Sequence, residues 1–261
     1  MIYYYKVFNT KLLSFLHKMK ESDKKHCNPI LFVLYCHRKM EVVLLKEKTM
    51  RDMFRLGFGE EVTNCITHGV MALLCIIFLP IAAIYSYLKG GAILATGISI
   101  FILCLFLMFL VSTLYHCMPF GSTHKYVFRK LDHICIYFAI AGSYTPVALT
   151  LIGGWQGYLI LAIEWSAVLG GVLLKAISSK SYPKLSMTIY MIMGWTAIFF
   201  LPTLLSKASI PFLALIIAGG LMYTIGAFFY GKPDHKYFHS IWHFCINIAS
   251  ILHIIAIVFV M

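Results

Sequence analysis

Long runs of apolar residues dominate the chain from about residue 66 to its end. Each run has roughly 20 residues, the length that an α-helix needs to cross the hydrocarbon core of a bilayer. The pattern therefore predicts an all-α integral membrane protein, a bundle of seven transmembrane helices. The predicted spans cover residues 66–87, 92–115, 132–152, 155–175, 186–206, 210–230 and 240–261.

Two of the predicted connections are very short. Gly153 and Gly154 separate the third and fourth spans, and a few residues around Lys207 separate the fifth and sixth. Connections of this length place neighbouring helices antiparallel. We expect two regions, a polar and basic tail over residues 1–60 and one membrane domain over residues 61–261.

The composition agrees with a membrane protein and excludes a soluble enzyme. Only 12% of the 261 residues are charged, whereas soluble domains carry about 25%. The net charge of +12 first suggests nucleic acid, but 20 of the 22 lysines and arginines lie in the tail or in alternate loops. This asymmetry predicts a cytoplasmic N-terminus and a C-terminus outside the cell. We expect the basic residues to meet membrane lipids, with no nucleic-acid partner.

The tail shows no sustained helical or strand period. Met50 stands directly before Arg51, and we hypothesise that translation begins there, so that residues 1–49 would be a mis-assigned start. The net charge would then fall to +6, because ten basic and four acidic residues would be lost. The asymmetry of the basic residues would remain.

Ionisable side chains within membrane spans are costly, and they are functional candidates by default. Because successive spans alternate in direction, four segments that are distant in the sequence bring polar groups to one depth near the cytoplasmic face. We expect a functional site there. Its candidate residues are Glu61, Asn64 and His68 at the first span, Ser112 and His116 ending the second, Asp132 opening the third, and His239 and His243 opening the seventh.

The spacing of the histidines favours a metal site. His239 and His243 are four residues apart, so both imidazoles project from one helical face. With His116 they would form a tetrahedral zinc site that has three protein ligands and one position for water, as catalytic zinc has. Asp132 would act on that water as a general base. Four residues would orient the ligands or stabilise developing charge from around the site, namely Ser112, Glu61, Asn64 and His68.

Several of these residues also have a purely structural interpretation. A His-x-x-x-His pair on a helix is a weak motif by itself, and His116 alone is typical of a residue that caps a helix or contacts headgroups. Asp132 would equally well cap the third helix. We expect His124 and His235 in solvated loops. Two ionisable residues near mid-span must face the bundle interior, without an assigned role: Glu164 and His253.

Six short motifs follow one another along the chain. They are Glu60-Glu61-Val62-Thr63-Asn64-Cys65-Ile66-Thr67-His68-Gly69, Ser112-Thr113-Leu114-Tyr115-His116, Leu131-Asp132-His133, Gly142-Ser143-Tyr144-Thr145-Pro146, Met193-Gly194-Trp195 and His239-Ser240-Ile241-Trp242-His243. In this order they resemble the hemolysin III family, the bacterial branch of the progestin and adipoQ receptor superfamily. The resemblance covers about residues 55–261.

The resemblance implies a seven-helix bundle with a cytoplasmic N-terminus and zinc bound by His116, His239 and His243. It also implies that Asp132 contacts the zinc-bound water and that Ser112 lies near the site. The superfamily is similar in layout to alkaline ceramidases, which implies hydrolysis of a lipid amide that enters laterally from the membrane. The alternative is a non-enzymatic protein, either a sensor or regulator of membrane homeostasis or a pore-forming hemolysin. The outer halves of the predicted spans are nearly all apolar, which disfavours an open channel.

Overall fold

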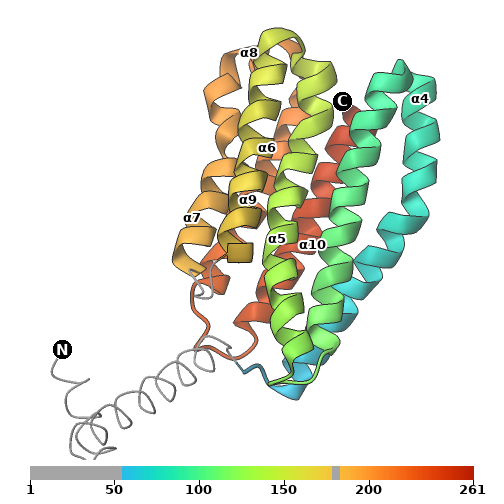
Figure 1. Cartoon of the computed structure of the whole chain (residues 1–261). Coiled ribbons are helices and arrows are strands. Elements are labelled where there is room, and N and C mark those ends of the chain that lie inside the picture. Colours follow the sequence, from blue (N-terminus) through green and yellow to red (C-terminus); the bar gives the residue numbers. More distant parts are fainter. Residues whose placement is uncertain (1–54, 178–182) are drawn as a thin grey trace, which may run out of the picture. The chain divides into compact units, whose positions relative to one another are not determined.

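The computed structural model describes residues 55–177 and 183–261 (Figure 1). In these ranges every regular element is helical, and six helices are long and apolar enough to cross a membrane. The prediction of an all-α membrane protein is confirmed. The hypothesis of a start at Met50 concerns residues outside these ranges. The seven crossings and the orientation of the two termini stay predictions.

The first helix, α4 (Phe58–Cys117), holds the first two predicted spans. Its backbone is non-helical at Gly90 and Gly91, and Gly91 has a φ of +75°, a conformation that glycine adopts without steric cost. There the chain doubles back, as Figure 1 shows. The Sγ atoms of Cys65 and Cys117 are 2.6 Å apart at the other end. The 60 residues of α4 therefore form two antiparallel arms.

The next helix, α5 (Thr123–Pro146), begins well before the predicted third span. Ser122 caps it, because its hydroxyl accepts a hydrogen bond from the backbone N–H of Lys125 at 3.0 Å. Asp132 therefore lies more than two turns inside the helix, and its interpretation as a helix cap is wrong. We expected His124 in a solvated loop, but it lies in the first turn of α5, where it is exposed.

A tight reversal joins α5 to the following helix. The π-helix η1 (Val147–Ile152) continues α5, and α6 (Gly154–Ile177) begins directly afterwards. Gly153 and Gly154 both have positive φ, +62° and +57°. A side chain at either position would be strained, so the two glycines allow the reversal that the sequence predicted.

The predicted fifth span is not one continuous helix. It consists of α7 (Pro183–Gly194), the 3₁₀-helix η2 (Thr196–Phe200) and α8 (Leu201–Lys207). Two helices follow, α9 (Ile210–Tyr230) and α10 (Phe238–Ile254), and the π-helix η3 (Ile255–Val260) extends α10. Ser209 caps α9 by accepting the backbone N–H of Phe212 at 3.4 Å.

The helices are apolar on their outer faces as well as between one another. The largest buried cluster joins the second arm of α4 to α10 and η3, around Ile98, Phe101 and Phe109. Large apolar side chains are also exposed along the bundle, for example Leu169 and Phe199 at 67% and 81%. An apolar outer surface of this extent suits lipid and not water.

Candidate metal centre

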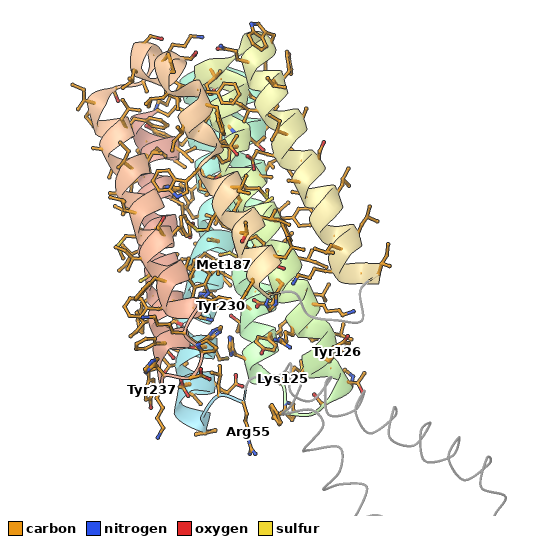
Figure 2. The ribbon with its side chains drawn as sticks, turned by 90° about the vertical axis from the view of Figure 1, so that its left-hand side faces the viewer. Arg55, Lys125, Tyr126, Met187, Tyr230 and Tyr237 are labelled. Carbon is orange, nitrogen blue, oxygen red and sulfur yellow. The ribbon has the colours of Figure 1, made fainter. Side chains whose placement is uncertain are left out.

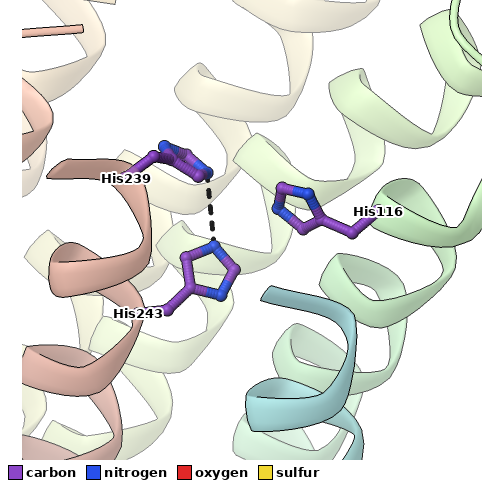
Figure 3. A group of neighbouring side chains, drawn as sticks. All are labelled: His116, His239 and His243. Carbon is purple, nitrogen blue, oxygen red and sulfur yellow. Dashed lines mark hydrogen bonds between the residues drawn. The ribbon is translucent and has the colours of Figure 1, made fainter. Parts of the chain in front are cut away.

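Three histidines that are distant in the sequence meet at one end of the bundle. His239 and His243 project from the first turns of α10, and His116 projects from the last turn of α4 toward them (Figure 3). One ring nitrogen of each lies within 4.8 Å of the other two. His116 and His243 are buried, and His239 is partly buried. The structure thus brings the three predicted metal ligands together at one end of the bundle.

The geometry of the three rings fits a metal ion. The Nε2 atoms of His239 and His243 are 3.2 Å apart, and two ligands of a tetrahedral ion with bonds of 2.0–2.1 Å stand about 3.3 Å apart. The His116 ring centroid lies 4.8 Å from that of His243. The Nε2 atom of His116 is buried, and no described residue gives it a hydrogen-bond partner. A metal ion would satisfy this nitrogen.

Glu61 fixes the orientation of His116. Its Oε2 atom lies 2.7 Å from Nδ1 of His116. A carboxylate only accepts hydrogen bonds, so Nδ1 carries the proton and Nε2 keeps its lone pair. Carboxylates hold metal-binding histidines in this way, through the nitrogen that does not bind the metal. Glu61 was expected to orient a ligand, and its contact with His116 agrees with that role.

A buried lysine, one of the basic residues whose distribution predicts the topology, completes this group. Lys125 is 1% exposed, and its Nζ atom lies 2.9 Å from Oε1 of Glu61. The same ammonium donates to the carbonyls of Tyr115 and Met118, at 3.2 Å and 3.1 Å. Figure 2 shows Lys125 at the same end of the bundle as Tyr230 and Tyr237. The chain Lys125–Glu61–His116 thus joins α5 to both arms of α4.

The position of Lys125 carried a signal that sequence reasoning could have used. Ser122 marks the start of α5, so Lys125 stands in the first helical turn, at the positive end of the helix dipole. A cation is unfavourable there unless negative groups surround it. The Glu61 carboxylate and the last carbonyls of α4 supply that negative charge.

Asp132 and Ser112 lie together beside the histidines. The hydroxyl of Ser112 is hydrogen-bonded to the Asp132 carboxylate, and this carboxylate interacts electrostatically with His116. The Asp132 side chain is 16% exposed. Ser112 is one helical turn before His116 on α4, so both residues face α5. The structure therefore brings the expected acid and the expected hydroxyl next to one metal-ligand candidate.

His68 and Asn64 pack against His243. The His68 ring stacks on His243, with centroids 3.7 Å apart and planes at 25°, and it contacts Phe109 edge-on. Asn64 is fully buried, and neither amide atom has a hydrogen-bond partner among the described residues. Both residues adjoin the group, although neither belongs to the cluster of three potential metal ligands.

Two other histidines have contacts of their own. His133 lies 2.6 Å from the Arg129 carbonyl through Nδ1 and 3.1 Å from the Tyr230 hydroxyl through Nε2. His253 lies 3.3 Å from the Ile216 carbonyl, as its interior position required. His235 lies in the loop between α9 and α10, where it was expected.

Glu60 sets the start of two helices at this end. Its Oε2 atom accepts the backbone N–H of Gly57 at 2.9 Å, and its Oε1 atom accepts that of Tyr237 at 2.6 Å. Tyr237 has a φ of +62°, which is unusual for a residue with a side chain. Helix α10 begins with the next residue, so Glu60 fixes the position from which His239 projects.

Comparisons with known proteins agree with this architecture. The model of a family described as haemolysin-III related matches residues 56–254. Hemolysin-3 of Bacillus cereus is 34% identical over 200 residues, which cover 77% of this chain and 91% of that protein. A hemolysin-3 homolog of Bacillus subtilis (strain 168) is 36% identical over 184 residues, 70% of this chain and 86% of the other.

A more distant similarity extends to mammals. The monocyte to macrophage differentiation factor of Homo sapiens is 26% identical over 205 residues, which cover 76% of this chain and 83% of that protein. The match of the family model spans most of the described residues, including all three clustered histidines. The chain belongs to the haemolysin-III-related family of multi-pass membrane proteins.

Proposed function

We propose that His116, His239 and His243 bind zinc and that the site hydrolyses an amide of a membrane lipid. The observation that carries this proposal is the junction of three imidazoles with a carboxylate, Asp132, inside a helical bundle. Three histidine ligands are typical of catalytic zinc, which keeps a further position open. Closed structural sites use four protein ligands.

The donor set favours zinc over harder ions. Imidazole suits zinc and other late transition metals, whereas magnesium and calcium prefer oxygen ligands. Bound zinc supplies a Lewis acid that polarises a carbonyl and makes water nucleophilic at neutral pH. The cluster offers three imidazole nitrogens. The neighbouring carboxylates already have other partners: Glu61 contacts His116 and Lys125, and Asp132 is hydrogen-bonded to Ser112.

Each neighbouring residue has a distinct part in this proposal. Asp132 accepts the proton of the attacking water and passes it to the leaving amine. The Ser112 hydroxyl holds the Asp132 carboxylate in place through their hydrogen bond. Glu61 keeps the His116 tautomer that leaves Nε2 free for the metal.

The position of the site supports a lipid substrate. The histidines lie at the end of helices whose outer faces are apolar, so the surrounding medium is the membrane. A lipid amide would enter laterally from the leaflet on that side, which the distribution of basic residues predicts to be the cytoplasmic one. Arg129, partly exposed on α5, adds positive charge at this end of the bundle, suited to anionic headgroups.

Metal analysis and hydrolysis assays of the purified protein test the proposal. We expect one zinc per chain, loss of zinc in His239→Ala and His243→Ala, and cleavage of a fluorescent N-acylsphingosine presented in mixed micelles. Asp132→Asn should keep the metal and lose hydrolysis. Full hydrolysis by Asp132→Asn would contradict the role of Asp132.

A protein that keeps zinc and hydrolyses none of a panel of lipid amides would favour the non-enzymatic alternative. The name of the Bacillus cereus relative, hemolysin-3, suggests lysis of cells. Release of haemoglobin from erythrocytes exposed to the purified protein measures that activity directly. Lysis that persists in His243→Ala would separate it from the metal site.

A further inference from the structure

Glu164 is the feature of the membrane interior that the metal centre leaves unexplained. It lies midway along α6, at 0% exposure, and neither carboxyl oxygen has a hydrogen-bond partner among the described residues. An ionised carboxylate in such surroundings, without a donor or a cation, is strongly unfavourable. The side chain therefore needs a partner that the protein groups around it do not provide.

The helix break at the end of α7 lies beside Glu164, because Thr196, directly after the break, interacts with that side chain. Trp195 departs from helical geometry there, with a φ of −101° and a ψ of 6°. The hydroxyl of Tyr144, on α5, enters the break: it donates to the Gly194 carbonyl at 2.9 Å and accepts the Ala197 N–H at 3.0 Å. Two motifs that the metal centre does not use thus meet, one around Tyr144 and one around Gly194.

The hydroxyl groups close to Glu164 have already committed their protons. Thr196 is the polar side chain beside Glu164, and its hydroxyl donates to the Ile192 carbonyl at 3.1 Å and not to the carboxyl group. The Tyr144 hydroxyl donates its hydrogen bond to the Gly194 carbonyl. Since a hydroxyl has one proton and two lone pairs, Thr196 can accept a hydrogen bond but has none left to donate. The surroundings thus suit a carboxylic acid that donates, and they do not suit a carboxylate that accepts.

Charged groups on the surrounding helices do not change this account. Among the described residues, no lysine, arginine or histidine forms an ion pair with Glu164. On α6 itself the other ionisable side chains are Tyr158 and Lys175, near its two ends. Tyr144 is the titratable group that faces Glu164 from α5. The remaining neighbouring elements carry no acid: η1 and η2 have no ionisable residue, α7 has Lys184 and Tyr190, and α8 has Lys207, which donates to the Ile152 carbonyl.

We propose that Glu164 is a proton-binding site within the bundle, linked to the helix break between α7 and η2. The bound proton forms a hydrogen bond from the carboxyl group to the hydroxyl oxygen of Thr196. When the proton leaves to a base in the solvent, the carboxylate needs a hydrogen-bond donor, and the Tyr144 hydroxyl turns from the Gly194 carbonyl to donate to it. The Gly194 carbonyl then lacks this donor, and the break between Gly194 and Ala197 loosens.

Carbodiimide labelling of the purified full chain in lipid nanodiscs tests the bound proton. The O–H of a carboxylic acid adds across a C=N bond of dicyclohexylcarbodiimide, and the acyl group then moves to nitrogen, so no further reactant is needed. At pH 7 we expect the stable adduct on Glu164 at least about tenfold faster than on Asp234, which is exposed to water in the loop before α10. Equal rates, or labelling of Asp234 alone, would overturn the proposal.

Amide hydrogen exchange tests the link to the helix break. In the natural chain we expect the amides of residues 195–200 to exchange faster at pH 10 than at pH 7, after correction for intrinsic rates. In Glu164→Gln, which cannot ionise, the corrected rates should be the same at both pH values. The same increase in both proteins would show that Glu164 does not control the break. Neither measurement depends on zinc or on hydrolysis, so failure here leaves the proposed function standing.

Discussion

At the metal centre Glu61 divides its two oxygens between His116 and Lys125, whereas neither oxygen of Glu164 in the middle of α6 has a described hydrogen-bond partner. Both carboxyl groups lie inside the same helical bundle. Glu61 is at the end where α4, α5 and α10 meet. There it contacts the buried ammonium of Lys125, which also donates to backbone carbonyls. Glu164 is surrounded by side chains whose donors are committed elsewhere.

The difference shows two ways of keeping an acid inside a membrane protein. Near the end of the bundle, an ion pair can extend to helix termini, whose carbonyls accept from the ammonium. Around Glu164 the described residues offer one helix break, the one after α7, and the Tyr144 hydroxyl already fills it. We therefore assign the ionised form to Glu61 and the protonated form to Glu164. The following experiments test that contrast, from the largest expected effect to the smallest.

Replacement of Lys125 by Met should have the largest effect on stability. It leaves Glu61 without its cation and the carbonyls of Tyr115 and Met118 without a donor. Removing one partner of a buried ion pair costs about 3–5 kcal/mol, measured as the free energy of unfolding in a detergent and denaturant titration. The double variant Glu61→Gln with Lys125→Met should lose less than the two single losses combined. Simple additivity would show that the pair is not coupled.

Metal removal should have the next largest effect. If zinc binds the folded protein alone, its withdrawal lowers stability by about 3 kcal/mol when the free metal had been near one hundred times its Kd. A chelator should therefore lower the Tm of the natural chain. The His243→Ala protein is the control, since it lacks a ligand and its Tm should not respond. An equal response of both proteins would place the metal elsewhere.

A glycine on α6 tests how closely the helices around Glu164 approach one another. A Cβ atom on Gly157 would collide with the backbone carbonyl of Ala148 in η1, whereas one on Gly170 would meet nothing within 4 Å. We expect Gly157→Ala to destabilise by about 1–3 kcal/mol, since backbone must move. Gly170→Ala should be neutral or stabilising, because alanine is the better helix former. Thermal unfolding of the pair of variants makes the comparison.

The two arms of α4 offer a test with almost no cost in stability. Cys65 and Cys117 have Sγ atoms 2.6 Å apart, so a mild oxidant that accepts two electrons should join them as a disulfide. With a protease site inserted between Gly90 and Gly91, the cut fragments should migrate as one band on a denaturing gel until a reductant is added. Cys65→Ser is the control, and its fragments should separate on that gel without a reductant. Separation of the oxidised fragments of the natural chain would contradict the antiparallel arms of α4 beside the candidate metal centre.

The convergence of the histidines was predictable because it rests on long-range regularities. Apolar run lengths give the spans, and alternation of direction brings His116 and His239 to the same end. The start of α5 was not predicted, because residues 123–131 contain four basic side chains and resemble a loop. The Ser122 cap and the burial of Lys125 stabilise a helix there. The contacts of the Lys125 ammonium involve α4, which no local pattern within α5 reveals.

The break after α7 was hidden for a similar reason. Residues 186–206 form one apolar run, and hydropathy alone indicates a continuous helix. The unpaired backbone groups at the break are satisfied by the Tyr144 hydroxyl from a helix some 50 residues earlier in the chain. A sequence pattern records where a helix would be stable in lipid. It does not record that another helix supplies the hydrogen bonds that a break requires.

The carboxylate of Glu60 fixes the point at which the segment between α9 and α10 ends. One of its oxygens holds the start of α4, and the other holds Tyr237, the last residue before α10. Residues 231–237 are exposed and would ordinarily tolerate insertions. One extra residue between Tyr237 and His239 would either break the bond to Glu60 or rotate the two histidines by about 100° around α10. A rotation of that size would turn His239 and His243 away from His116, so the bond between Tyr237 and Glu60 keeps the candidate metal ligands aligned.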